Sequence, residues 1–266
     1  MNDIYTLFRG SRPLIVSMPH VGTAIPDDLR KHFVDEALHT PDTDWHLDAL
    51  YAFVKDEGAS LIVPAMSRYV IDLNRPADDK PMYAGANNTE LCPTRSFEGT
   101  PLYQSSRAPD AAEIARRRAT YWHPYHEALT REIERVRSTH GHAIVFDAHS
   151  IRSELPWLFE GKLPDLNLGT SNGASCAPSL REALSRVLAT QTRYTYAVDG
   201  RFKGGYITRH YGQPELAVHA IQLEMCWSCY MVEAPPYRVD PMRADELRSV
   251  LTPLIGAMLD WRPDVR

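Results

Sequence analysis

The sequence has no long apolar run, few cysteines and no excess of positive charge, and each absence excludes a class of protein. No window approaches the ~20 consecutive apolar residues that a membrane-crossing helix requires. The first residues carry Asp3 and no apolar core, so we expect no secretory signal. The 29 basic and 34 acidic side chains give a net charge of −5, which argues against binding to duplex nucleic acid. We therefore expect a soluble, cytoplasmic protein whose partner is a small molecule, with no membrane or nucleic acid involved.

The 4 cysteines among 266 residues are too few for a disulfide framework, and they suit a reducing compartment. Cys226 and Cys229 form a C-x-x-C pair, but no second pair completes a structural zinc site. A redox role is one interpretation of this pair; the other is that both thiols are buried as small apolar side chains. Histidine, in contrast, is abundant at 11 residues, and it is the commonest metal ligand.

Short apolar runs alternate with helical patterns along the chain, which predicts an α/β fold with a central mixed, mostly parallel sheet flanked by helices. No repeat or linker marks a boundary, so we expect a single domain over residues 1–266. Pro124 predicts a kink or break in the helix that contains it. The Pro-, Gly-, Asn- and Ser-rich stretch 74–109 predicts a long loop. The predicted strands are 14–18, 60–65, 69–73, 143–146, 193–198 and 218–225, and the predicted helices are 27–33, 44–56, 110–140, 178–188 and 245–259.

Groups able to do metal chemistry stand at the ends of three predicted strands. His20 follows the first strand, His149 follows 143–146, and Glu224 lies near the end of 218–225. Ligands of open α/β sheets bind beyond the carboxyl ends of strands. Two imidazoles, one carboxylate and an open position suit a catalytic zinc ion, and a second carboxylate suits the general base. Each histidine alone is more typical of a structural role, whereas Glu224 has a stronger claim because an unpaired buried carboxylate is costly. The three together indicate a metal site.

The third metal ligand is open between two carboxylates, Asp42 and Asp44, which precede the predicted helix 44–56. We prefer Asp44, because it stands against the predicted helix start. The other carboxylate would then cap the helix or orient a ligand.

Arginines near the predicted strand ends indicate an acidic substrate. Asn74 and Arg75 directly follow the predicted strand 69–73, and Arg209 lies in the glycine-rich segment 204–212. Arginine holds carboxylates in a two-pronged hydrogen bond, so two arginines beside one crevice would suit a dicarboxylate. The alternative for Arg75 is a surface pair with Asp72 or Asp78. Further candidates that the sequence does not rank are Arg68, Arg95, Arg152 and Arg201.

Five segments, in this order along the chain, resemble the N-formylglutamate amidohydrolase family. They are PHVG at 19–22, DTDW at 42–45, SRYVIDLNRP at 67–76, FDAHS at 146–150 and GGYITRHYG at 204–212. The resemblance implies a zinc-carboxypeptidase-like (phosphorylase/hydrolase-like) fold, shared with zinc carboxypeptidases and acylamino-acid deacylases. Those wider relatives carry a carboxylate three residues after the first histidine, where this chain has Thr23. That departure moves the third ligand to Asp44 or Asp42.

The resemblance implies hydrolysis of N-formyl-L-glutamate to formate and L-glutamate, a step of histidine degradation. It assigns one divalent metal ion, zinc or else cobalt, iron or manganese, to His20 and His149, and we add Asp44 as the preferred third ligand. It assigns the general base to Glu224, and substrate binding to Asn74 and Arg75; we add Arg209 for the second carboxylate. Two alternatives stand beside this function. One is a related metal-dependent deacylase or carboxypeptidase, and the other is a non-catalytic protein that binds acidic metabolites.

Overall fold

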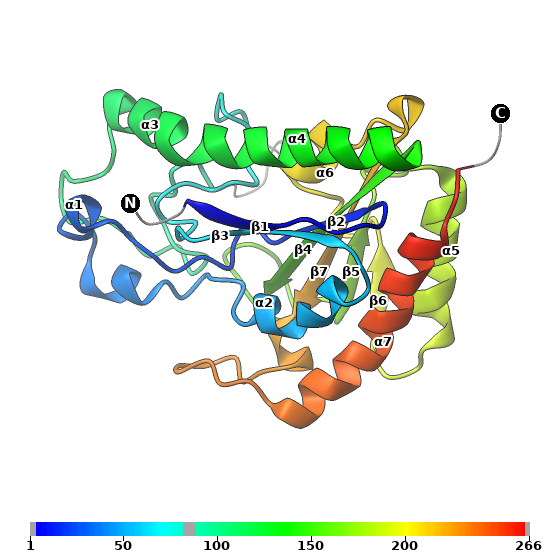
Figure 1. Cartoon of the computed structure of the whole chain (residues 1–266). Helices are drawn as coiled ribbons and strands as arrows, with labels where there is room; N and C mark the ends of the chain where they lie inside the picture. The colour runs from blue at the N-terminus through cyan, green and yellow to red at the C-terminus, as the bar shows by residue number, and fades with distance from the viewer. Residues whose placement is uncertain (1–3, 82–88, 264–266) are drawn as a thin grey trace.

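One sheet of seven strands runs through the computed structural model, which describes residues 4–81 and 89–263 (Figure 1). The strand order is β1-β3-β2-β4-β7-β5-β6, and four of the six pairings are parallel. The predicted mixed, mostly parallel sheet is therefore confirmed, while the single-domain boundaries stay a prediction. The strands are β1 (Tyr5–Phe8), β2 (Leu14–Ser17), β3 (Ser60–Pro64), β4 (Ala143–Ile151), β5 (Leu166–Gly169), β6 (Tyr196–Val198) and β7 (Val218–Cys226).

Helices cover both faces of this sheet, as the alternation of patterns predicts. In Figure 1, α4 runs along one side of the sheet, and α2 and α7 lie on the other. No helix of the described residues is long and apolar enough to cross a membrane. The helices are α1 (Asp27–Arg30), α2 (Leu47–Leu50), α3 (Ala111–Arg117), α4 (His123–His140), α5 (Pro178–Thr190), α6 (Tyr206–Tyr211) and α7 (Pro241–Asp260). Short 3-10 turns occupy Asp35–His39, Ala52–Lys55, Pro214–Leu216 and Trp227–Cys229.

Two hydrophobic cores lie on the two faces of the sheet, because successive strand residues point to opposite sides. Phe146 of β4 belongs to the core that contains α2, α5 and α7. Val145, its neighbour, belongs to the core under α4 and α6. Each β4 residue is buried, which is the pattern expected of a central parallel strand covered on both sides.

The long helix predicted over 110–140 is one helical path with a local change of pitch. Its first residue is capped by Asp110, whose carboxylate accepts a hydrogen bond from the Glu113 amide. A π turn over Arg118–Trp122 joins α3 to α4 and ends two residues before Pro124, the residue that predicts a kink. Because proline has no amide hydrogen to donate to the preceding turn, irregular pairing at this point is expected. Gly141, with φ 77°, ends α4.

Several sequence predictions of elements are wrong, and the reasons are physical. Residues 69–73 form turns instead of a strand, and neighbouring side chains satisfy their carbonyls. Conversely, β1 and β5 are strands that the apolar pattern misses, because Thr6 and Asn167 interrupt their short apolar runs. β4 continues through the polar sequence Asp147–Ser150 to Ile151, paired residue by residue with β7. His149 therefore lies within a strand and not after one.

Candidate active site

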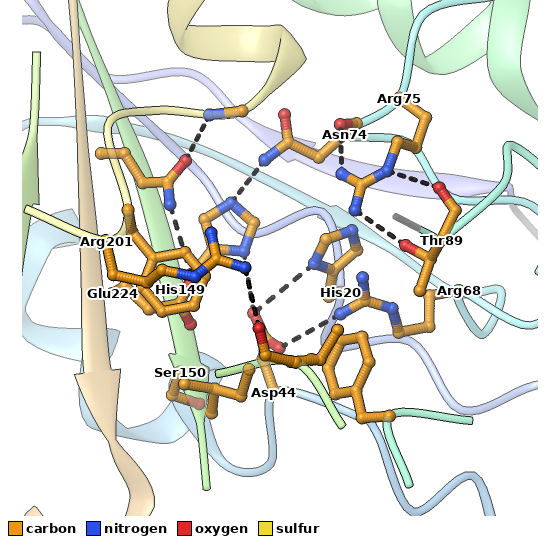
Figure 2. Close-up of a pocket in the computed structure, with 16 residues that line it drawn as sticks. His20, Asp44, Arg68, Asn74, Arg75, Thr89, His149, Ser150, Arg201 and Glu224 are labelled. Carbon is orange, nitrogen blue, oxygen red and sulfur yellow. Dashed lines mark hydrogen bonds and ion pairs between the residues drawn. The ribbon is translucent and has the colours of Figure 1, made fainter. Parts of the chain in front are cut away.

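Three parallel neighbours, β2, β4 and β7, bring their carboxyl ends to one edge of the sheet. His20 lies just beyond β2, and His149 and Glu224 are register partners on β4 and β7. All three line one cavity, which Figure 2 shows from close up. The predicted placement of chemistry at strand ends thus puts these three side chains in one place.

Asp44 lies between the two histidines. Its Oδ2 is 3.0 Å from His149 Nδ1 and 3.8 Å from His20 Nδ1, and the imidazole centroids are 4.8 Å apart. One potential ligand atom from each of the three residues lies within 4.8 Å of the others, and all three residues are buried. The Asp44 amide also donates to the His20 carbonyl at 3.0 Å, which fixes the loop before α2 against the end of β2.

The Nδ1 atoms of both histidines face Asp44, and their Nε2 atoms contact two further carboxylates. His20 Nε2 lies 2.6 Å from Asp72 Oδ1, and His149 Nε2 lies 3.0 Å from Asp147 Oδ2. Because carboxylates are acceptors, a proton on each Nε2 can be donated outwards, which leaves the Nδ1 lone pair to bind an ion shared with Asp44. Without an ion, a proton can fill the 3.0 Å gap between His149 Nδ1 and Asp44 Oδ2, because, although burial opposes this, Asp147 and Asp44 raise the pKa of His149 well above its usual range. The donor set and its outer partners therefore fit a divalent metal ion.

Asp42, the alternative ligand, lies elsewhere. Its Oδ2 accepts hydrogen bonds from the Tyr69 hydroxyl and the Phe97 amide, both at 2.7 Å. Burial raises the pKa of Asp42. The structure thus brings Asp44 to the histidines and uses Asp42 to hold loops together.

Glu224 enters the cavity from β7 and is only 7% exposed. Burial raises the pKa of its carboxyl to about 8, with His149 opposing the shift and Asp44 adding to it. The Gln222 amide donates to Glu224 Oε2 at 3.4 Å. A carboxyl whose pKa lies near neutrality is suited to accept and return a proton.

Arg68 is a buried charge beside the histidines, and the sequence does not single it out. Its Nη2 donates to Asp72 Oδ2 at 2.7 Å, its Nη1 lies 4.0 Å from Asp44 Oδ1, and its guanidinium stacks over Phe97. Although burial opposes ionisation, His20 and Arg68 hold the pKa of Asp72 well below its usual range. Asp72 therefore stays a carboxylate that orients His20.

Two further arginines line the cavity, and both lie in loops. Arg75 donates to the Thr89 carbonyl at 3.0 Å and to its hydroxyl at 2.7 Å. Arg201 donates to the Leu158 carbonyl at 3.1 Å. In Figure 2, Arg75 and Arg201 lie on opposite sides of the two histidines. Among the described residues that line the cavity, Arg201 is present and Arg209 is not; Arg209 donates from α6 to the Gly204 carbonyl at 2.9 Å.

Asn74 is fully engaged with the protein. Its Nδ2 donates to Asp147 Oδ2 at 3.0 Å, and its Oδ1 accepts from the Ile207 amide at 2.8 Å. Gly205 allows this arrangement, because a Cβ there would lie 2.3 Å from Asn74 Nδ2. The glycine-rich segment thus brings backbone close to Asn74, which itself lies 2.9 Å from His149 Nε2.

The C-x-x-C pair lies outside the cavity lining. Cys226 and Cys229 are buried and free, and burial raises the pKa of the Cys229 thiol to about 12. A raised thiol pKa disfavours the reactive thiolate. The buried-thiol interpretation of this pair fits the structure.

Comparisons with known proteins agree on one family. The model of the family described as N-formylglutamate amidohydrolase matches residues 12–231. The N-formylglutamate deformylases of Pseudomonas putida and Pseudomonas aeruginosa are 49% and 46% identical over 261 residues, covering 98% of this chain and 97% and 98% of theirs. The crystal structure of N-formylglutamate amidohydrolase from Ralstonia eutropha JMP134 matches with a TM-score of 0.82 at 27% identity, covering 96% of this chain and 97% of that one.

Proposed function

The chain belongs to the N-formylglutamate amidohydrolase family, and we propose that it hydrolyses N-formyl-L-glutamate to formate and L-glutamate. One observation carries the proposal: His20, Asp44 and His149 converge in a cavity that Glu224 also lines. That set combines a metal site with a proton carrier, as amide hydrolysis requires. The same combination separates this proposal from a protein that only binds acidic metabolites.

We assign His20, Asp44 and His149 to one divalent ion. When bound, the ion supplies Lewis-acid activation of a water molecule and of the formyl carbonyl. Zinc is our choice because two imidazoles and a carboxylate are typical of its catalytic sites, and the same donors also accept cobalt, iron or manganese. Asp72 and Asp147 orient the two imidazoles from outside.

Glu224 is the proposed general base and then the general acid. It accepts a proton from the attacking water as the new C–O bond forms at the formyl carbon. It returns that proton to the glutamate nitrogen as the C–N bond breaks, so that formate and a free amine leave. Its buried position on β7 and its raised pKa support both transfers.

We propose that Arg75 and Arg201 bind the two substrate carboxylates. Both line the cavity, and Arg75 is held by Thr89 in an orientation that faces it. Asn74 contributes to substrate binding through Arg75 and His149, because its own amide is engaged with Asp147. Arg201 takes the role that sequence reasoning gave to Arg209.

The location of the reaction is part of the proposal. Four buried free cysteines suit a reducing compartment, so we retain the expected cytoplasmic location. We also retain the expectation of a single catalytic domain. The proposed partner is a small N-acyl amino acid.

The test is a formate-release assay on the purified protein with N-formylglutamate, N-formylglutamine and N-acetylglutamate. We expect formate from N-formylglutamate, loss of activity after dialysis against a chelator, and recovery with added zinc. Cleavage of N-acetylglutamate or a peptide without formate release would instead identify a related deacylase or carboxypeptidase. Binding of acidic metabolites without turnover, unchanged by the chelator, would identify a binding protein.

A further inference from the structure

The buried segment 69–75 is held by side chains of the long helix, since no neighbouring strand pairs with it among the described residues. Three of its carbonyls accept N–H groups from consecutive turns of that helix. The bonds are Arg117 Nη1 to Val70 O at 3.1 Å, His126 Nε2 to Leu73 O at 2.9 Å and Trp122 Nε1 to Arg75 O at 3.0 Å. Each satisfies a buried backbone group that would otherwise cost stability.

The π turn is what puts these donors on one face of the helix. Arg117 and Trp122 are five residues apart, which in a regular α-helix would separate their side chains by about 140° around the axis. A π turn absorbs one extra residue, so both side chains point towards the segment 69–75. Trp122 is then fixed by its neighbours, with its ring centroid 3.9 Å from that of His126 and 5.7 Å from that of Tyr206.

The three hydrogen bonds from the long helix do not contribute equally to the active site. Asp72, which orients His20, is itself held by Arg68 and by the Asn74 amide at 2.8 Å. Arg75 has weaker backbone support, since its amide donates to the Asp72 carbonyl at 3.3 Å. The backbone of Arg75 thus makes two hydrogen bonds, and the one that its carbonyl accepts from the Trp122 indole is the shorter. The guanidinium of this same residue lines the cavity.

We propose that Trp122 is a positioning residue, whose indole N–H fixes the Arg75 backbone so that the Arg75 guanidinium holds a substrate carboxylate. The inference rests on the proposed function in so far as Arg75 binds that carboxylate. It predicts an effect on substrate binding that leaves metal binding and proton transfer in place.

The test compares Trp122→Phe with Trp261→Phe. Both indoles are nearly buried, at 7% and 8% exposure, and each donates one hydrogen bond, but Trp261 donates to Ser179 Oγ outside the cavity lining. We expect Trp122→Phe to raise KM for N-formylglutamate roughly five-fold, as the loss of one hydrogen bond allows, with kcat and metal content little changed. Trp261→Phe should leave KM unchanged.

A double-mutant cycle separates positioning from general destabilisation. If Trp122 acts through Arg75, Trp122→Phe should add little to KM in an Arg75→Ala background. Equal effects in both backgrounds, an unchanged KM, or the same rise in Trp261→Phe would overturn the proposal. Trp122→His retains a ring N–H donor, so a KM below that of Trp122→Phe supports the hydrogen bond, and an equal or higher KM contradicts it.

Hydrogen exchange tests the anchor without relying on activity. Backbone amides of residues 72–75 should exchange faster in Trp122→Phe than in the parent protein or in Trp261→Phe. Unchanged exchange would overturn the proposal. If the parent protein releases no formate from N-formylglutamate, the proposed function fails on its own, and the exchange comparison still decides whether Trp122 fixes this segment.

Discussion

Replacing Glu224 with glutamine should damage activity and at the same time stabilise the metal-free protein. The substitution keeps the size of the side chain in the buried site on β7, and it removes the group that accepts and returns a proton. General acid–base catalysis contributes about 10²–10⁴-fold, so we expect kcat to fall by that range. KM should change little, because Arg75 and Arg201 remain to bind the substrate.

The gain in stability follows from the pKa of Glu224, which burial raises from 4.5 to about 8. Between these values the native state holds a proton that the unfolded state has released, so stability falls as pH rises through this window. At about 1.4 kcal/mol per pH unit, the parent protein loses roughly 3 kcal/mol between pH 4.5 and pH 7. Glutamine does not titrate, so the variant should keep that free energy, and its advantage should shrink below about 1 kcal/mol at pH 5.

The assay is urea unfolding of chelator-dialysed protein at pH 5 and pH 7, alongside formate release by the metal-loaded protein. Glu215→Gln is the matched control, because it makes the same chemical change at an exposed position and should alter neither measurement. A Glu224→Gln variant that retains kcat within about ten-fold of the parent would refute the role as general base. A variant less stable than the parent at pH 7 would refute the reasoning on burial.

Three further predictions concern other residues. Asp44→Asn should lose bound metal by elemental analysis while Asp42→Asn retains it; the reverse result would exchange their roles. Arg201→Ala should raise KM for N-formylglutamate about ten-fold but leave KM for N-formylglutamine nearly unchanged, and an equal rise for both substrates would place Arg201 away from the side-chain carboxylate. Burial lowers the pKa of His219 from 6.5 to about 4, so the unfolded chain takes up a proton that the native state excludes, and stability is lost as pH falls through this window. His219→Gln should therefore reduce the loss of unfolding free energy between pH 7 and pH 5 by about 2 kcal/mol in urea titrations; an unchanged loss would contradict this.

The sequence predicts the central strands and their chemistry well, because both follow from one physical requirement. A parallel strand covered on both faces must be apolar along its length, so polar side chains such as His149 and Glu224 stand out. The parallel arrangement then brings those side chains to the same edge of the sheet. The place of His20 in the site can be predicted from its position after β2 alone.

The segment 69–75 shows why the remainder of the site could not be predicted. Its apolar residues are buried, which is typical of a strand, but its carbonyls bond to side chains that lie some 50 residues further along the chain. Periodicity contains no information about such partners. The same limit applies to Arg201 and Arg209, since their distances from the cavity depend on how the chain folds between β6 and the end of α6.

Charge balance gives a further reason to place a divalent ion in this site. Asp44, Asp72 and Asp147 are almost fully buried carboxylates, and the two histidines link them. Arg68 is a buried cation that contacts Asp44 and Asp72. With both imidazoles neutral, and with Glu224 left out as the proton carrier, the three carboxylates and Arg68 sum to a charge of −2, which a divalent ion would balance. Buried charge without a counter-ion is costly, so a divalent ion would stabilise the cluster whose ligand atoms it fits.

The same accounting explains why a dicarboxylate suits the cavity. Arg75 and Arg201 add two positive charges to its walls, beyond those that balance the buried carboxylates. N-formylglutamate brings two carboxylates, which match these two charges, whereas N-formylglutamine brings only one. Because a charge without a counter-charge in a buried site disfavours binding, the walls discriminate against the amide. The charges that bind the metal and those that select the substrate are therefore separate sets, and a substitution in one should leave the other in place.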